Sequence, residues 1–314
     1  MKILVYFPFT PEQLAGLREV AGGHEVLHAT TDEEGVRLVP DATALLGHFP
    51  PPVFAAAKEL RWIQSFSAGM DNFLYPAVIE SDVMVTNMAG IYASQGAEHA
   101  WAMLLALARG IPRFVRAQDR REWHRSPIVE VTGGTLGIIG MGGFGQEMAR
   151  RAAGYDMTVI AVDPVLTEAP PGVAELKKPT REALLDLLSR SDAVMIACPK
   201  IPETLNLISR EELAAMKPGA FLIGVTRGGI VDEEALADAL RSGHLGGAGL
   251  DVFSREPLPP ESPLWELENL IITSHVAGAS QRRPQRTYDF FRENLRRFVA
   301  GEPLLNVVDK KRGF

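Results

Sequence analysis

The stretch that decides the fold is Thr135-Leu136-Gly137-Ile138-Ile139-Gly140-Met141-Gly142-Gly143-Phe144-Gly145, where an apolar run leads into closely spaced glycines. Gly140, Gly142 and Gly145 form the pattern G-x-G-x-x-G, which alone is a weak signal. Here it follows a predicted strand and precedes a predicted helix over residues 146–153, the context that a dinucleotide-binding turn requires. In such a turn the first glycine permits the tight bend, the second lets the backbone approach a pyrophosphate, and the third lets helix pack on strand. The start of the helix would offer N–H groups and partial positive charge to the phosphates.

The next predicted strand, residues 158–162, is followed by Asp163. A carboxylate in this position can accept hydrogen bonds from the adenosine ribose and would repel a 2′-phosphate. No arginine follows within several residues to offset that repulsion, so we predict NAD as the cofactor in preference to NADP. The alternative is an ordinary strand–turn–helix unit that binds no ligand.

Short apolar runs alternate with helical stretches along the whole chain, which predicts βαβ units and parallel sheets. In the first third, strands are predicted at residues 2–7, 25–28, 44–46 and 62–65, with helices at 11–20 and 52–58. A second series has six predicted strands, at residues 135–140, 158–162, 193–197, 220–226, 247–252 and 270–273. Helices are predicted between them, for example at 181–188 and 233–241, and the C-terminal part is predicted as a helix at 285–298 and an extended segment at 302–308. With 314 residues, the chain has the length of two α/β domains.

Composition excludes several classes of function. The net charge of −7 argues against a general nucleic-acid binder, and the arginine-rich residues 113–125 are interrupted by Asp119 and Glu122, which predicts a solvated helix face. A single cysteine, Cys198, excludes internal disulfides and cysteine-based zinc sites. No histidine, His99 beside Glu98 included, has the spacing of a metal ligand, so no metal is expected. The N-terminus reads as a strand and no apolar run is long enough for a bilayer, so we expect a cytoplasmic protein with no membrane partner.

Three further segments carry side chains with useful chemistry: residues 225–232, 250–257 and 273–278. Each comes after a predicted strand, at the carboxyl edge where doubly wound sheets bind ligands. They contain Arg227, Glu256 and His275. Taken singly, these residues would more often be a surface ion pair, a loop carboxylate and a buried histidine.

Together, these segments resemble the D-isomer-specific 2-hydroxyacid dehydrogenase family. The resemblance rests on the glycine pattern and on three motifs in family order: R-G-x-x-V-D-E-x-A-L at 227–236, L-D-V-F-x-x-E-P at 250–257, and P-L-W-x-x-x-N-x-x-x-T-x-H-x-A-G at 263–278. It covers nearly the whole chain, including the Ser67-Ala68-Gly69-Met70-Asp71 loop. It implies two doubly wound α/β domains, with a Rossmann NAD-binding domain (100–283) inserted into a flavodoxin-like substrate domain (1–99 and 284–314). The active site would lie in the cleft, and hinge closure would exclude water.

The resemblance also implies roles for single residues. Arg227, always charged, would make a forked contact to carboxylate and carbonyl oxygens. His275 would donate the proton in reduction and accept it in oxidation, and Glu256 paired with it would favour the imidazolium and fix the ring. The implied substrate contacts are Ala68 and Gly69, through their amides, with Arg227 and His275. The implied cofactor contacts are Gly140, Gly142, Gly143, Phe144, Gly145, Asp163, Pro199, Thr226, Asp251 and Gly278.

Three positions depart from the family pattern. Gly143-Phe144 stands where a larger polar residue and isoleucine are commoner, which would loosen the pyrophosphate turn. Lys200 replaces an apolar residue and could face either cofactor or solvent. Ser274 replaces the usual proline before His275, which would free the local backbone. None of the three removes a catalytic group.

The predicted function is NAD-dependent hydride transfer between a small D-2-hydroxy acid and its 2-keto acid, similar to a glyoxylate or hydroxypyruvate reductase. A 3-phosphoglycerate dehydrogenase is a weaker expectation, because no regulatory domain follows Phe314. Two alternatives stay open: an NAD(H)-sensing binding protein that resembles a corepressor, and a formate or phosphite dehydrogenase of the same family. Residues 97–109, apolar on nearly every side and containing Trp101, are predicted to form a buried helix at a domain or subunit boundary, which would suit the interface of a homodimer.

Overall fold

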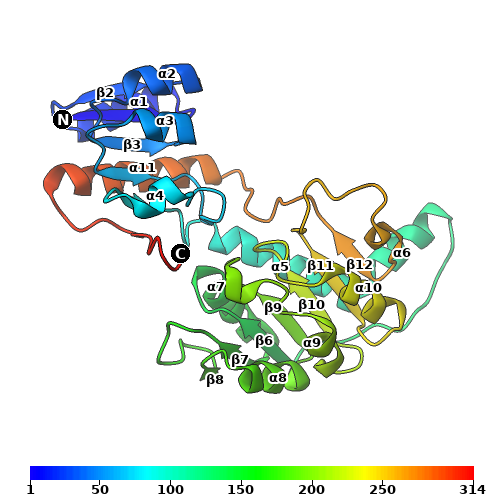
Figure 1. Cartoon of the computed structure of the whole chain (residues 1–314). Coiled ribbons are helices and arrows are strands. Elements are labelled where there is room, and N and C mark those ends of the chain that lie inside the picture. The colour runs from blue at the N-terminus through cyan, green and yellow to red at the C-terminus, as the bar shows by residue number, and fades with distance from the viewer. The chain divides into compact units, whose positions relative to one another are not determined.

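The computed structural model describes residues 1–314, which divide into two compact units. The first unit comprises Met1–Tyr92 and Ser280–Phe314, and the second comprises Ala93–Ala279 (Figure 1). Each unit contains one fully parallel sheet, so every connection between paired strands is a crossover. No helix combines the length and the apolar character that crossing a membrane requires.

The sheet of the first unit has the strand order β2-β1-β3-β4-β5. Its strands are β1 (Lys2–Tyr6), β2 (Glu25–His28), β3 (Ala44–Gly47), β4 (Trp62–Gln64) and β5 (Met84–Thr86). Its helices are α1 (Pro11–Val20), α2 (Asp32–Leu38), α3 (Pro51–Ala56), α4 (Pro76–Glu80) and α11 (Arg283–Ala300). This order is that of the flavodoxin-like fold, as predicted, with its switch point between β1 and β3.

The sheet of the second unit has the order β12-β11-β10-β9-β6-β7-β8. Its strands are β6 (Thr135–Ile139), β7 (Thr158–Val162), β8 (Glu175–Lys177), β9 (Ala193–Ile196), β10 (Phe221–Gly224), β11 (Gly247–Leu250) and β12 (Leu270–Ile272). Its helices are α5 (Ala93–Ala108), α6 (Ile111–Asp119), α7 (Gly143–Ala152), α8 (Arg181–Arg190), α9 (Arg210–Ala215) and α10 (Glu233–Arg241), and the short 3₁₀ turns are η1 (Ala153–Tyr155), η2 (Pro202–Thr204) and η3 (Pro263–Glu266). Read from β8, the first six strands have the Rossmann order 3-2-1-4-5-6, with the switch point between β6 and β9.

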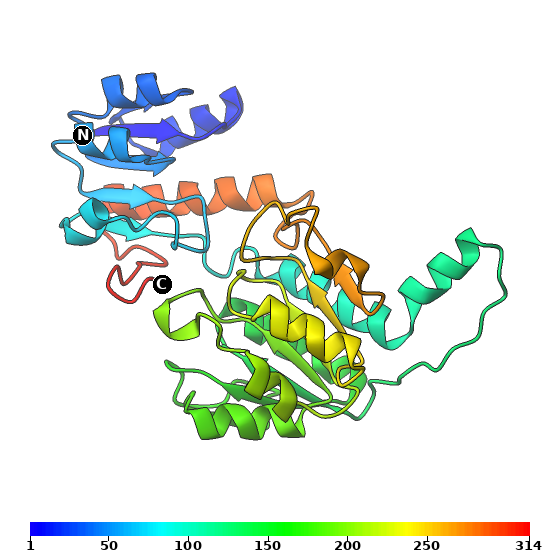
Figure 2. The ribbon, with the colours of Figure 1, turned by 45° about the vertical axis from the view of Figure 1, so that its right-hand side comes forward.

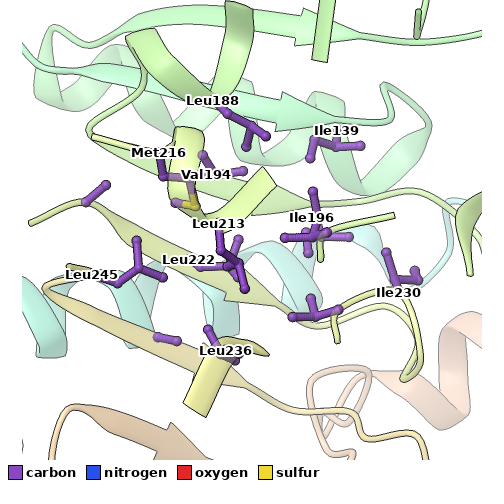
Figure 3. Packing of buried hydrophobic residues seen from close by; sticks show 14 of the residues in the cluster. Ile139, Leu188, Val194, Ile196, Leu213, Met216, Leu222, Ile230, Leu236 and Leu245 are labelled. Carbon is purple, nitrogen blue, oxygen red and sulfur yellow. The ribbon is translucent and has the colours of Figure 1, made fainter. Parts of the chain in front are cut away.

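The second unit buries apolar side chains on both faces of its sheet. Successive strand residues point to opposite sides, and helices cover each side. One face packs against α8, α9 and α10 and includes Ile196 and Leu222 (Figure 3). The other face packs against α5 and α7 and includes Met195 and Ile223. Because helices cover both faces of this sheet, its strands appear in the sequence as nearly continuous apolar runs.

The strands predicted from the sequence are all present, each within two residues at either end. The structure adds two short strands, β5 and the polar edge strand β8, and the short helices α2, α4 and α9. Two helix starts were predicted three or more residues too late: α7 begins at Gly143 rather than at 146, and α5 begins at Ala93 rather than at 97. The segment 302–308 is irregular apart from one bridge between Thr86 and Val307.

Candidate active site

The glycine-rich turn joins β6 to α7, and the fold leaves no room for a side chain at two of its positions. Gly140 has a φ of +95°, and a Cβ atom there would lie 2.8 Å from the main-chain nitrogen of Cys198. A Cβ atom on Gly145 would lie 2.1 Å from the carbonyl oxygen of Gly140. Gly142 faces open space, with no atom within 4 Å of the place its Cβ would take. Glycine is therefore required at 140 and 145 by the fold, while the space beside Gly142 is free for a ligand.

The start of α7 carries free N–H groups. The helix begins at Gly143, and no side chain caps its first turn. Since the first N–H groups of a helix have no partner within it, those of Gly143 and Phe144 are available to an anion. The Phe144 ring packs on α5, where its Cε1 atom lies 2.0 Å from the place a Cβ on Gly96 would take. An uncapped helix start beside an open glycine fits the pyrophosphate of a dinucleotide.

Asp163 follows β7 and is buried. Its Oδ2 atom accepts a hydrogen bond from the Met141 amide at 2.7 Å. Its Oδ1 atom accepts the amides of Val165 and Leu166 at 2.7 and 2.9 Å. Because a carboxylate has about four acceptor positions, one remains for a ribose hydroxyl. Asp163 thus ties the glycine turn to the loop after β7 and also places a negative charge there.

Pro199 and Thr226 lie in the loops after the neighbouring strands β9 and β10. The Thr226 hydroxyl donates to the Cys198 carbonyl at 3.0 Å, and the Thr204 hydroxyl donates to the Pro199 carbonyl at 2.7 Å. Burial raises the pKa of the Cys198 thiol to about 12, so the thiol stays protonated and unreactive at neutral pH. Lys200 lies beside the loop after β10, with its Nζ atom 3.7 Å from the place a Cβ on Gly229 would take.

Arg227 follows β10, and the two glycines after it let this loop approach the loop after β11. A Cβ atom on Gly228 would lie 1.8 Å from the carbonyl oxygen of Phe253, and Gly229 has a φ of +81°. The Arg227 guanidinium donates through Nη1 to the carbonyl of Thr226 at 2.8 Å. The close approach places the loop of Arg227 directly against the loop that carries Glu256.

His275 and Glu256 form a pair at the carboxyl edge of the sheet. The Nδ1 atom of His275 lies 2.7 Å from Oε2 of Glu256, and the other carboxylate oxygen accepts the Phe253 amide at 2.9 Å. The carboxylate is held from both sides, which fixes the ring and makes Nδ1 the protonated nitrogen. The side chain of His275 is 46% exposed, and its Nε2 atom makes no hydrogen bond within the chain. The opposite edge of the ring is therefore free to exchange a proton with a ligand.

Asp251 lies beneath His275 and is fully buried. Its carbonyl oxygen accepts the His275 amide at 2.8 Å. Its carboxylate accepts the amides of Val276 and Ala277 at 2.9 and 2.8 Å and the hydroxyl of Thr273 at 2.5 Å. Asp251 therefore holds three consecutive residues of the loop, including His275 in its left-handed conformation at φ +55°.

The Ser67–Gly69 loop of the first unit follows β4, at the carboxyl edge of that unit's sheet. The Ser67 hydroxyl donates to the Gly69 carbonyl at 2.8 Å, and the Asn87 side chain donates to the Ala68 carbonyl at 2.9 Å. The amides of Ala68 and Gly69 make no hydrogen bond in the structure. Two unpaired N–H groups on a fixed loop form a fitting receptor for a carboxylate.

The structure also brings in residues to which the sequence assigned no role. The Nε2 atom of His99, on α5, lies 2.9 Å from the Thr273 hydroxyl and 3.7 Å from Oδ1 of Asp251. The Gln95 side chain, one turn earlier, donates to the Gly278 carbonyl at 3.3 Å. In the sequence His99 lacks the spacing of a metal ligand, and nothing there indicates that it meets a loop far along the chain.

Known proteins resemble this chain both in sequence and in fold. A family model described as "D-isomer specific 2-hydroxyacid dehydrogenase, NAD binding domain" matches residues 101–277. The D-3-phosphoglycerate dehydrogenase of Mycobacterium tuberculosis is 38% identical over 277 residues, 86% of this chain and 52% of that protein. The glyoxylate reductase of Korarchaeum cryptofilum is 36% identical over 286 residues, 88% of this chain and 85% of that protein. A crystal structure of a D-isomer specific 2-hydroxyacid dehydrogenase from Xanthobacter autotrophicus, in complex with NADPH and MES, has a TM-score of 0.86 at 33% identity and covers 99% of both chains.

The family model covers most of the second unit, which is therefore an NAD-binding domain of this family. The chain belongs to the D-isomer specific 2-hydroxyacid dehydrogenase family, as its motifs predicted. It spans about half the length of the curated phosphoglycerate dehydrogenases that it matches.

Proposed function

We propose that the protein reduces a small 2-keto acid to the D-2-hydroxy acid with NADH, and catalyses the reverse oxidation with NAD. The observation that carries this proposal is the His275–Glu256 pair, 2.7 Å apart, beside the loop of Arg227. Carbonyl reduction needs a cation for the substrate carboxylate and a proton donor for the carbonyl oxygen. The three side chains supply both at one edge of the NAD-binding sheet.

Each of these residues has a defined task in the proposed reaction. Arg227 binds the carboxylate and the carbonyl oxygen through its planar fork, which orients the carbonyl and polarises it. Bound NADH supplies a hydride for the carbonyl carbon. As the hydride adds and the carbonyl double bond becomes a single bond, His275 gives the proton on Nε2 to the carbonyl oxygen. Glu256 stabilises the imidazolium before the transfer. In oxidation His275 accepts the same proton.

The first unit is proposed to bind the substrate through the amides of Ala68 and Gly69. Their N–H groups are unpaired within the chain, so a substrate carboxylate would satisfy both at once. Within the substrate class, glyoxylate and hydroxypyruvate are the proposed members. The similarity to a glyoxylate reductase along 88% of this chain and 85% of that protein supports that choice.

The test is oxidation of NADH with a panel of 2-keto acids: glyoxylate, hydroxypyruvate, phosphohydroxypyruvate and phenylpyruvate. Turnover of glyoxylate or hydroxypyruvate, with the highest kcat/KM of the panel, is expected. A highest kcat/KM for phosphohydroxypyruvate would move the substrate to the phosphoglycerate class. Binding of NADH without any turnover would favour an NAD(H)-sensing protein, and NADH production from formate or phosphite would favour the third alternative.

We further propose NADH over NADPH, on account of the Asp163 carboxylate. In the Asp163→Ala variant, the ratio of kcat/KM for NADH to that for NADPH is expected to fall by about tenfold or more, since the charge that repels a 2′-phosphate is gone. The amides of Met141, Val165 and Leu166 lose their acceptor as well, so the melting temperature should also fall. Steady-state kinetics with both cofactors measure the ratio, and an unchanged ratio would contradict the role of Asp163.

A homodimer is proposed, but the surface expected for it needs correction. Trp101 is buried in its own unit, where it stacks on Tyr155 at 4.9 Å and donates to the Met148 carbonyl. A group of exposed apolar side chains lies instead on α6 and the segment after it, which extend away from the sheet of their unit (Figure 2). They are Ile111, Val115, Trp123, Ile128 and Val129, and Trp123 is 93% exposed.

Light scattering should therefore give a mass of about twice 34.2 kDa. The Trp123→Glu variant is expected to raise the dissociation constant of the dimer by about tenfold or more, because tryptophan is enriched among the few residues that carry most of the binding energy of an interface. Trp265→Glu is the control, since Trp265 is another exposed tryptophan of the same unit, at 52%. A monomeric wild type, or equal effects of the two substitutions, would contradict this assignment.

A further inference from the structure

We infer that His99, acting through Thr273, is a positioning residue for the loop that carries His275. The inference deepens the proposed function, because it concerns the same site. The contacts form one chain: His99 Nε2 to Thr273 Oγ1 at 2.9 Å, and Thr273 Oγ1 to Asp251 Oδ1 at 2.5 Å. From Asp251 the chain continues to the backbone of the His275 loop.

The direction of each hydrogen bond follows from counting protons. A threonine hydroxyl has one hydrogen, and an ionised carboxylate can only accept. Thr273 therefore donates to Asp251, and its oxygen must accept from His99. His99 consequently carries its proton on Nε2, whether the ring is neutral or charged. A side chain without a hydrogen-bond donor at position 99 would leave the Thr273 hydroxyl free to rotate away from Asp251.

Asp251 depends on these partners because it is fully buried. A buried carboxylate is stabilised only by the donors that surround it, and here these are Thr273 and the amides of Val276 and Ala277. The same three bonds fix the backbone next to His275, whose φ of +55° is unfavourable for a residue with a side chain. Loss of the Thr273 donor therefore removes one of the hydrogen bonds that stabilise the buried Asp251 carboxylate. The loop that this carboxylate holds becomes less firmly fixed.

Helix α5 contacts the loop that carries His275 at two points, through Gln95 and through His99. Gln95 and His99 are four residues apart and thus share one face of the helix. Gln95 donates to the carbonyl of Gly278, and His99 donates to Thr273, so the helix holds the loop on both sides of His275. Both residues lie in the unit that contains His275.

Proton donation is sensitive to such positioning. A displacement of about 1 Å at a reacting group can cost a factor of about 10² in rate. We therefore expect His99→Leu and Thr273→Val each to lower kcat by about tenfold to a hundredfold, with the Kd of NADH changed less than about threefold. His99→Gln and Thr273→Ser keep a donor and should recover most of the loss.

A double-variant cycle separates positioning from packing. If the two residues act in series, His99→Leu with Thr273→Val should be no slower than the slower single variant. His244→Leu is the matched control, since His244 is a half-buried histidine of the same unit whose Nε2 atom contacts the Leu213 carbonyl at 3.0 Å. That control should keep the wild-type kcat.

A second readout needs no turnover at all. Hydrogen–deuterium exchange of the peptide that contains Val276 and Ala277 should be faster in His99→Leu and Thr273→Val, and unchanged in His244→Leu. An active wild type whose variants show unchanged kcat and exchange would overturn the inference, as would a double variant whose loss equals the product of the single losses. An inactive wild type whose exchange still responds as described would overturn the proposed function while retaining the positioning role.

Discussion

Replacing His275 with alanine is expected to reduce kcat by about 10²–10⁴-fold, the range that a positioned general acid contributes. The expectation follows from the free Nε2 edge of a ring whose Nδ1 atom is fixed by Glu256 at 2.7 Å. NADH binding should be retained, because the glycine turn and Asp163 belong to other loops of the sheet. Stopped-flow measurement of a single turnover gives the chemical step, and fluorescence titration gives the Kd of NADH.

Two further variants sharpen that experiment. Glu256→Gln keeps the hydrogen bond but removes the charge that favours the imidazolium, so its loss should be smaller than that of His275→Ala. His244→Ala removes a histidine of the same unit outside the site and should behave as wild type. Near-normal turnover in His275→Ala would assign the proton transfer to another group.

Replacing Arg227 with glutamine is expected to reduce kcat/KM for the keto acid by about 10³-fold. A single hydrogen-bond donor aimed at a developing oxyanion accounts for about 10²–10³ in rate, and the lost charge adds to the loss through weaker carboxylate binding. Both kcat and KM should change, since the guanidinium is proposed to contact the carboxylate in the ground state and the carbonyl oxygen in the transition state.

Arg227→Lys distinguishes charge from geometry. It keeps the charge but loses the planar fork, so its kcat/KM should lie between those of wild type and Arg227→Gln. Arg210→Gln is the control, because Arg210 pairs with Asp238 at 2.7 Å on the surface. A KM for the keto acid that stays at the wild-type value in Arg227→Gln would contradict carboxylate binding by this residue.

The apolar strands of the second unit could be predicted from the sequence because both faces of its sheet are covered, which favours apolar residues along each strand. The edge strand β8, Glu-Leu-Lys, was missed because two of its three residues are charged and it contains no apolar run. The early start of α7 was missed because Gly143 and Gly145 are poor helix formers, and Gly145 is placed in the helix by its close approach to Gly140 and Ile138.

Some residues of the candidate site could likewise be predicted from the sequence, and others could not. Arg227, Glu256 and His275 could be singled out because each follows an apolar strand, and parallel strands end at one edge. Their assigned roles, like the domain borders, stay predictions. His99 could not be found, because its contact with Thr273 spans 174 positions and depends on how α5 packs on the sheet. The helix that contains Trp101 was predicted to be buried at a domain or subunit boundary; it is buried and begins where the second unit begins, but Trp101 itself packs within its own unit.

The most direct test of the proposed reaction is chiral analysis of the product formed from NADH and hydroxypyruvate by the wild-type protein. The expected product is D-glycerate, formed in a one-to-one ratio with the NADH consumed. The L-enantiomer would contradict the proposed placement of hydride and proton. NADH that binds but is not consumed, with this or any other 2-keto acid of the panel, would contradict the proposed reaction.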